Sequence, residues 1–207
     1  MNFIKNQYKQ VAKFFKTDVI GLFVVCLLSF LGLSVMSHFL FMGNQTAAQE
    51  IIHTMMASFD ESGLNTDNNF LMMWGLLKNN VVATLSATAL GVIPCAFLPI
   101  IVIASNGIII GMVTSFSVSG GQGGLFLAAG LLPHGIFEIP ALALSVALGL
   151  NLCLQLTRKI FSKAGQPTFI ELTRETLRSY LLTVLPLLLI AAFVEAFITG
   201  AVINLVI

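Results

Sequence analysis

The chain has 207 residues, of which 57% are hydrophobic and only 9% are charged. Soluble domains usually carry about 25% charged residues, so this composition excludes a soluble globular protein with an ordinary surface. The formal net charge of +1 gives no sequence-wide basic field and argues against nucleic acid as a partner. The lipid bilayer is therefore the expected environment.

The N-terminal part of the chain predicts a basic cytoplasmic segment, 1–17, followed by a membrane-spanning helix at 19–42. A span needs about 20 apolar residues. The basic stretch is long and no small-residue cleavage site ends the apolar run, so we expect a retained span and not a cleaved signal peptide. A polar outer loop, 43–79, follows this span.

The next apolar region runs from Val81 to Leu132 without a charged residue. At about 1.5 Å per residue it is too long for one span, so the chain must turn within it. Gly and Asn clusters offer the turn signals, and we expect broken or re-entrant segments near 105–107 and 120–135. The spans predicted on this basis are 80–104, 107–132 and 133–157; an alternative makes Leu125–Leu132 a re-entrant half-helix.

The remaining segments are a cytoplasmic loop, 158–178, and a last span, 179–207, which complete a single transmembrane domain, 18–207. Lys and Arg gather before the first span and in the 158–178 loop, which places both in the cytoplasm and the C-terminus outside. Residues 168–180 form either an interfacial helix or a solvated helix leading into the last span. We therefore predict an all-α, polytopic membrane helix bundle with about five transmembrane helices, located as a multi-pass protein in the cell membrane.

The stretch 131–142, "LLPHGIFEIPAL", places His134 and Glu138 inside this apolar region. A charged side chain at mid-membrane costs about 2.5–3.5 kcal/mol on insertion scales. At positions i and i+4 the two side chains share one face of a helix, where they can share a proton or carry opposite charges. Two interpretations remain open: a buried polar site, or a pair near the outer interface that caps a helix start.

Two prolines and a glycine surround this pair. Pro133 and Gly135 indicate a helix start at a turn between spans, because Pro is well tolerated in the first helical turn. Pro140 removes the donor for the Ile136 carbonyl and leaves an acceptor unsatisfied one turn into the helix. Irregular backbone at membrane depth is tolerated only where protein or water covers it.

Other polar residues in the apolar segments extend the candidate site. Glu195 lies within the last span, and an intramembrane Glu almost always faces the bundle interior; we expect it to reach the His134/Glu138 region or Asn106, or else to make an independent structural contact. Asn80 is either a helix cap or a site residue, and Asn106 is either a turn residue or a neutral ligand. Gly107 and Gly111 form a GxxxG pattern that permits close helix approach.

Four stretches in this order resemble the stage II sporulation protein M family (SpoIIM, also called DUF95): "LLKNNVVATLSATALGVIP", "SNGIIIGMV", "LLPHGIFEIPAL" and "AAFVEAFITG". They cover Asn79–Gly200, and the Pro-His-Gly-x-x-Glu sequence is the most specific of them. The resemblance implies a polytopic helical membrane protein. The family's namesake is needed for engulfment in endospore-forming bacteria, where it anchors a peptidoglycan-degrading complex with two cell-wall hydrolases. The family also occurs in organisms that never sporulate.

Three functions follow from these observations. The first, implied by the resemblance, is a non-enzymatic scaffold for envelope proteins, with other membrane or envelope proteins and further copies of the chain as partners. The second is a transporter or channel in which His134, Glu138 and Glu195 bind a cation or relay protons. The third is an intramembrane metallohydrolase, which the H-x-x-x-E spacing and the single intramembrane His disfavour. We expect the scaffold, with no catalytic residues, no metal and no cofactor.

Overall fold

The computed structural model describes residues 2–44, 46, 49–50, 68–120, 124–161 and 167–205. Its elements are helical, as the all-α prediction requires. In chain order they are α1 (Asn2–Phe14), a π-helical turn (Phe15–Val19), α2 (Ile20–Met42), α4 (Asn69–Ala89), a 3-10 turn (Leu90–Val92), α5 (Pro99–Ser119), α6 (Gly124–Phe161), α7 (Phe169–Ser179), a π-helical turn (Tyr180–Val184), α8 (Leu185–Val194), a π-helical turn (Glu195–Thr199) and α9 (Gly200–Asn204).

Within the described part of the chain, four helical stretches are long and apolar enough to cross a membrane: Ile4–Met42, Pro99–Ser119, Gly124–Phe161 and Phe169–Asn204. The remaining long helix, α4, has 21 residues but is less apolar, because Lys78, Asn79 and Asn80 lie in its middle. These lengths and compositions fit the predicted all-α helix bundle.

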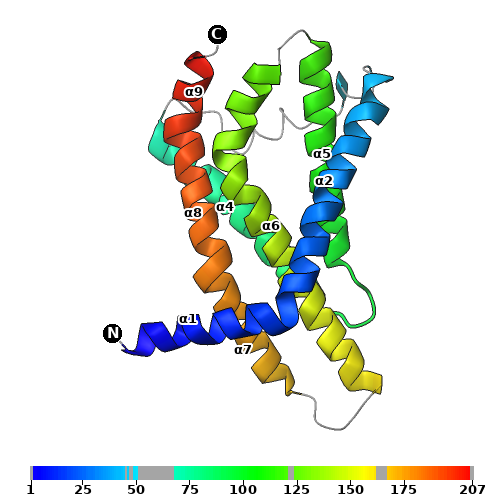
Figure 1. The fold of residues 1–207 in the computed structure, drawn as a ribbon, viewed down its shortest axis with the longest axis vertical. Helices are drawn as coiled ribbons and strands as arrows, with labels where there is room; N and C mark the ends of the chain where they lie inside the picture. The colour runs from blue at the N-terminus through cyan, green and yellow to red at the C-terminus, as the bar shows by residue number, and fades with distance from the viewer. Residues whose placement is uncertain are drawn as a thin grey trace.

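The long helices run side by side and alternate in direction. From the end where α1 lies, α2 runs outward, α4 returns, α5 runs outward, α6 returns, and α7, α8 and α9 form one rod that runs outward again (Figure 1). The two chain ends therefore lie toward opposite ends of the long axis. At the π-helical turn Phe15–Val19 the chain changes direction, so that α1 lies across the bundle instead of along it (Figure 1).

Helix α6 forms the centre of the bundle. In its most apolar window 72% of the residues are buried, against 17% for the stretch that contains α2 and 28% for α5. It packs against α2, α4, α5 and α8, and an unbroken buried run, from Ala141 to Cys153, fills the middle of the molecule. Because this one helix is enclosed by the others, its polar residues are the ones that need partners inside the protein.

Helices α2 and α5 approach each other closely at the GxxxG pattern. A Cβ atom added at Gly111 would lie 2.2 Å from the Ser34 carbonyl oxygen, and one at Gly107 would lie 3.1 Å from the Phe30 carbonyl oxygen. The close approach that the pattern predicts therefore occurs. Across this contact Ser37 Oγ donates to the Ile108 carbonyl oxygen at 2.8 Å, so the two backbones are joined as well as packed.

The predicted break near 105–107 is wrong. Helix α5 is continuous through Asn106 and Gly107, because Asn106 donates its amide to the Val102 carbonyl of the same helix at 2.8 Å and Gly107 lies against α2. The chain turns earlier, between Ala89 and Pro99, where Cys95 and Phe97 have positive φ angles of 65° and 50°. Such conformations cost about 1–3 kcal/mol each.

Contacts with α6 hold this turn in place. Cys95 N–H donates to Thr157 Oγ1 at 2.9 Å, and Cys153 Sγ donates to the Ile93 carbonyl at 3.3 Å. Gly91 packs directly on Gly149, since a Cβ at Gly91 would lie 2.0 Å from the Gly149 carbonyl oxygen. The prolines at positions 94 and 99 were the sequence signal for this turn.

The helix bounds differ from the predicted spans in three further places. Helix α4 begins at Asn69 with Asn68 as its cap, whose side chain accepts from Phe70 N and Leu71 N, so residues 69–79 are helical and Asn80 is not a cap. The second predicted break is narrower than 120–135, because α5 ends at Ser119 and α6 is helical from Gly124. Residues 125–132 are therefore part of α6 and not a separate half-helix. The bounds of the predicted spans 80–104, 107–132 and 133–157 change accordingly.

The predicted loop 158–178 is shorter in the structure. Helix α6 continues to Phe161, and α7 begins at Phe169 behind a capping box in which Thr168 and Glu171 exchange side-chain and backbone hydrogen bonds. Helix α7 passes without interruption into the C-terminal rod. At its far end Arg178 donates to Gln10 of α1, which ties the transverse helix to the rod.

Candidate polar site at the centre of the bundle

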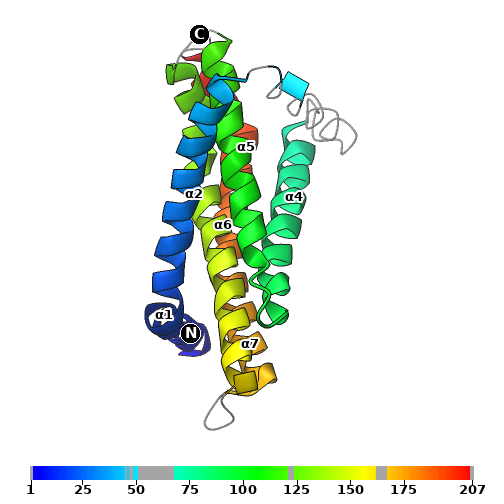
Figure 2. The ribbon, with the colours of Figure 1, turned by 90° about the vertical axis from the view of Figure 1, so that its right-hand side faces the viewer.

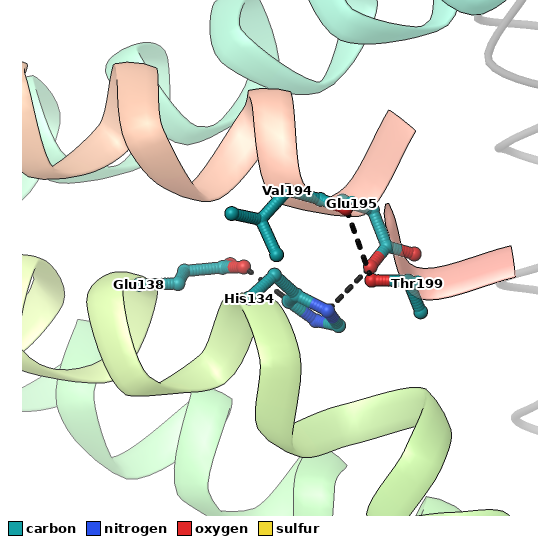
Figure 3. A network of polar contacts seen from close by, with 5 residues as sticks. All are labelled: His134, Glu138, Val194, Glu195 and Thr199. Atoms are coloured by element: carbon teal, nitrogen blue, oxygen red, sulfur yellow. Dashed lines mark hydrogen bonds and ion pairs between the residues drawn. The ribbon is translucent and has the colours of Figure 1, made fainter. Parts of the chain in front are cut away.

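A contact between ionisable side chains joins α6 to the C-terminal rod. His134 Nδ1 contacts the Glu195 carboxylate Oε2, and the opposite ring nitrogen, His134 Nε2, lies 4.0 Å from Glu138 Oε2. The histidine therefore lies between two carboxylates, one from its own helix and one from the rod (Figure 3). Both nitrogens of a protonated imidazole can donate, so this geometry suits a shared proton.

Irregular helical backbone presents both partners. Pro133 lies inside α6, where it has no N–H for the Ala129 carbonyl; such a proline kinks or breaks the helix in which it lies. Glu195 opens the π-helical turn Glu195–Thr199, in which Thr199 Oγ1 donates to the Val194 carbonyl at 3.3 Å (Figure 3). A π-helical turn inside an α-helix is rare and frequently marks a functional position.

The position of Pro133 corrects one prediction. Pro133 and Gly135 do not start a helix, because α6 begins at Gly124. His134 consequently lies about 15 Å inside α6 at 1.5 Å per residue, and it does not cap a helix start. Glu195 lies about 14 Å from the end of α9 at Asn204 by the same measure. Both depths are about half of the ~30 Å hydrocarbon thickness of a bilayer.

Two adjoining cavities lie beside this cluster. The larger, about 100 Å³, is lined by residues of α2, α5 and α6: Phe30, Asn106, Ile110, Leu131, His134, Gly135, Glu138, Ile139 and Leu142. The smaller, about 20 Å³, is lined by Asn80, Ala83, Thr84, Asn106, Glu138, Leu142 and Leu188. Glu138 and Asn106 line both. A cavity needs about 10–15 Å³ to hold a water with polar partners, so both have room for water.

All five predicted polar residues thus lie together. His134 and Glu195 are in contact, Glu138 is within 4.0 Å of His134, and Asn106 and Asn80 reach the same region through the cavities. Of the motif residues, Gly135 lines the larger cavity, and Pro140 lies inside α6 between the lining residues Ile139 and Leu142. Gly107 and Gly111 belong instead to the contact between α2 and α5.

The charge balance of the cluster limits its protonation states. Two carboxylates and one imidazole in a low-dielectric interior are neutral only if the three groups together hold two dissociable protons. One arrangement is a protonated His134 with one ionised and one neutral carboxyl group. Among the described residues, no group of three or more His, Cys, Asp or Glu is arranged to hold a metal ion. The contacts of His134 with both carboxylates and the adjoining cavity suit proton sharing and water binding.

Sequence reasoning missed one polar contact near the site. Thr84 Oγ1 and Tyr180 Oη lie 2.8 Å apart and link α4 to the π-helical turn Tyr180–Val184. Thr84 also donates to the Asn80 carbonyl at 2.7 Å, and Thr88 donates to the Ser145 carbonyl of α6 at 3.1 Å. A threonine in an apolar helix bonds so often to its own backbone that its sequence position gives no signal of a second partner.

Comparison with known proteins gives one family and one distant relative. The model of the family described as Stage II sporulation protein M matches residues 19–200. An uncharacterized protein of Methanocaldococcus jannaschii is 36% identical over 73 residues, which cover 35% of this chain and 40% of that protein. The matched part is thus less than half of either protein. No solved structure matches the chain.

Proposed function

The chain belongs to the stage II sporulation protein M family of membrane proteins, and from that premise we propose that it is a non-enzymatic, multi-pass scaffold of the cell membrane that recruits cell-envelope proteins. In a spore former these partners would be peptidoglycan-remodelling proteins. One observation carries the proposal: the side chains of His134, Glu195 and Glu138 are only 17%, 26% and 38% exposed, and the cavities beside them measure about 100 and 20 Å³. Small-molecule sites usually measure about 300–1,000 Å³.

The partly buried cluster of His134, Glu138 and Glu195 has a structural use in a scaffold. Lipid chains are as apolar as leucine, so apolar helices in a bilayer gain no hydrophobic energy from meeting one another. A polar contact that is satisfied only in one arrangement, such as that of His134 with Glu195, selects the register of α6 against the rod. The outward faces of the helices remain free for partners, and their exposed apolar residues include Leu28, Val35 and Leu189.

The arrangement of basic residues supports a cytoplasmic N-terminus. Helix α1, with Lys5, Lys9 and Lys13, lies at the same end of the bundle as the end of α6 and the start of α7 (Figure 1). Arg158 and Lys159 lie in the last turn of α6 at that end. Since Lys and Arg are enriched on the cytoplasmic side of short membrane-flanking segments, this end faces the cytoplasm and the C-terminus faces outward.

Depletion of the protein from its own cells tests the scaffold. A fluorescently tagged envelope hydrolase that co-purifies with the protein should lose its confined distribution and spread through the membrane when the protein is depleted. Restoring the protein should restore the pattern. An unchanged distribution of every co-purifying envelope protein would refute the scaffold.

A second function, proton conduction, is favoured by one specific observation: His134 lies between two carboxylates and beside a cavity large enough for water. Purified protein in liposomes with an imposed pH gradient should then carry a proton flux that Glu138→Gln abolishes. Glu175→Gln is the matched control, because Glu175 pairs with Arg178 on α7 outside the cluster. A flux equal to that of empty liposomes would exclude this function.

A further inference from the structure

The outward face of α4 carries a charge in the middle of an apolar stripe. Leu71, Trp74, Val82 and Leu85 recur at helical spacing and are 60%, 59%, 57% and 43% exposed. Lys78 is exposed at the centre of this stripe, beside the exposed Asn79. Helix α4 forms one flank of the bundle (Figure 2), and the exposure of these residues places them on its outward face.

The depth of Lys78 makes this exposure costly. Lys78 lies about 14 Å from the start of α4 at Asn69, and Asn80, two residues on, lines the same cavity as Glu138. Lys78 is therefore level with the polar cluster near the middle of the bundle. A lysine at the centre of a lipid-facing helix costs about 2.5–3.5 kcal/mol on insertion scales, and such residues normally pair with another group.

Nothing in the described part of this chain pairs with Lys78. The ion pairs there join His134 to Glu138, His134 to Glu195, and Arg178 to Glu175. Of the described carboxylates, only Glu138 and Glu195 lie at this depth, and both point into the bundle. Among the long helices α2, α4, α5 and α6, Lys78 is also the only exposed residue with a formal charge in the middle of the helix. The missing partner is therefore an acceptor outside the described chain.

We propose that the stripe Leu71–Trp74–Lys78–Val82–Leu85 of α4 binds a transmembrane helix of another protein that carries an Asp or Glu at mid-membrane depth. The proposal rests on the scaffold function, since it identifies the chemistry of one recruited partner. A second copy of this chain fits less well. In a two-fold dimer the same patch meets itself, and Lys78 would face Lys78 without a carboxylate between them. Asn79 adds a hydrogen-bonding group that a polar residue on the partner helix can use.

The test is photo-crosslinking in native membranes followed by a charge swap. A photoreactive residue at Val82 probes the stripe while leaving Lys78 intact. The same residue at Leu28, 63% exposed near the middle of α2, is the matched control. We expect a crosslink from Val82 to a membrane protein with a carboxylate in its span. Its yield should fall about tenfold or more in Lys78→Met and Lys78→Glu and persist in Lys78→Arg. Replacing the partner's carboxylate by Lys should restore it in Lys78→Glu.

Any other crosslinking result overturns the proposal. A crosslink to a second copy of the chain would mean that this face of α4 is a self-association surface. A crosslink to residues 51–67 of the same chain would mean that the protein itself covers this face. Labelling of lipid alone would mean that Lys78 extends to the membrane–water interface without a protein partner. If Lys78→Met leaves the crosslink yield unchanged, the charge of Lys78 does not contribute to the interaction. A Lys78-dependent crosslink together with an unaltered hydrolase distribution after depletion would keep this interface and reject only the scaffold. A hydrolase distribution that changes on depletion, together with a crosslink that does not depend on Lys78, would reject only the interface.

Discussion

Two helix contacts in this bundle are built on opposite principles. Helices α2 and α5 meet through backbone atoms, because Gly107 and Gly111 leave no room for a side chain between them. Helix α6 and the C-terminal rod meet through His134 and Glu195, beside cavities and on irregular helical backbone. The first contact is dense, and its polar bonds, Ser37 to the Ile108 carbonyl and His38 to Thr114, include no carboxylate, whereas the second joins a histidine to a carboxylate.

The difference shows how an apolar chain obtains a unique arrangement of helices. Close packing of small residues gives van der Waals energy that lipid cannot match. It selects the register of two helices only through the steric fit of their surfaces. A polar contact is satisfied in one register and costs several kcal/mol in any other. The α2–α5 contact at the edge of the bundle therefore depends mainly on close packing. The contact between α6 and the rod, at the centre of the bundle, depends on polar side chains.

The largest expected effect follows from breaking the polar contact. Glu195→Leu removes the carboxylate that His134 Nδ1 contacts across the two helices, and removing one partner of a buried pair typically costs about 3–5 kcal/mol. We expect a loss of about 3 kcal/mol in the free energy of unfolding, measured by denaturant titration in bicelles. Glu175→Leu on α7 is the control and should lose less than about 1 kcal/mol. Equal losses of unfolding free energy in the two variants would mean that the contact between His134 and Glu195 stabilises the protein no more than a surface ion pair does.

A substitution in the α2–α5 contact should cause a smaller loss of stability, and its cause should be steric. Gly111→Ala places a Cβ atom 2.2 Å from the Ser34 carbonyl oxygen, so α2 and α5 must separate, at about 1–3 kcal/mol for overpacking. Gly32→Ala in α2 has nothing within 4 Å of the new Cβ and should be neutral or slightly stabilising. Thermal unfolding of both variants in the same detergent measures the difference. A Gly111→Ala protein as stable as Gly32→Ala would contradict the close approach.

A hydrogen bond between α4 and the rod gives an intermediate case. Thr84→Val removes the 2.8 Å contact with Tyr180 Oη at nearly constant volume and should cost about 1 kcal/mol. Tyr180→Phe should cost a similar amount, and the double variant little more than either one. Fully additive losses in denaturant titrations would show that the two groups do not bond to each other.

The smallest effect is expected outside both contacts, at the start of α7. Thr168→Ala removes the capping box with Glu171 and should cost about 0.5–1 kcal/mol. Hydrogen exchange by mass spectrometry should show faster exchange confined to the first turn of α7. Faster exchange throughout α8 would mean that the cap stabilises the whole rod, which our account does not expect.

The sequence predicted the chemistry of this molecule better than its helix boundaries. Composition was sufficient for an all-α membrane bundle, and the cost of burying charge was sufficient to group His134, Glu138 and Glu195, because ionisable side chains in apolar helices need one another. The turn at 90–98 was missed although it contains Pro94 and precedes Pro99, since Asn106–Gly107 is the stronger turn dipeptide in isolation. Asn106 instead bonds to its own helix.

The location of Pro133 in the interior of a helix could not be predicted from local rules. Proline favours the first turn of a helix, yet here it lies inside α6, which packs against α2, α4, α5 and α8. The π-helical turn at Glu195 leaves no sequence signature either, since it inserts one residue into an otherwise ordinary apolar helix. Both irregularities depend on tertiary packing, and both lie where the two halves of the polar contact meet.

A double-mutant cycle between His134 and Glu195 tests the central claim most directly. His134→Ala, Glu195→Leu and the double variant are unfolded in bicelles, with His134→Ala and Glu175→Leu as the parallel control cycle. We predict that the two central residues are coupled by about 1–2 kcal/mol and that the control pair is additive. Additivity of His134 and Glu195 within about 0.3 kcal/mol would contradict the account, because α6 and the rod would then be held together without the contact between them.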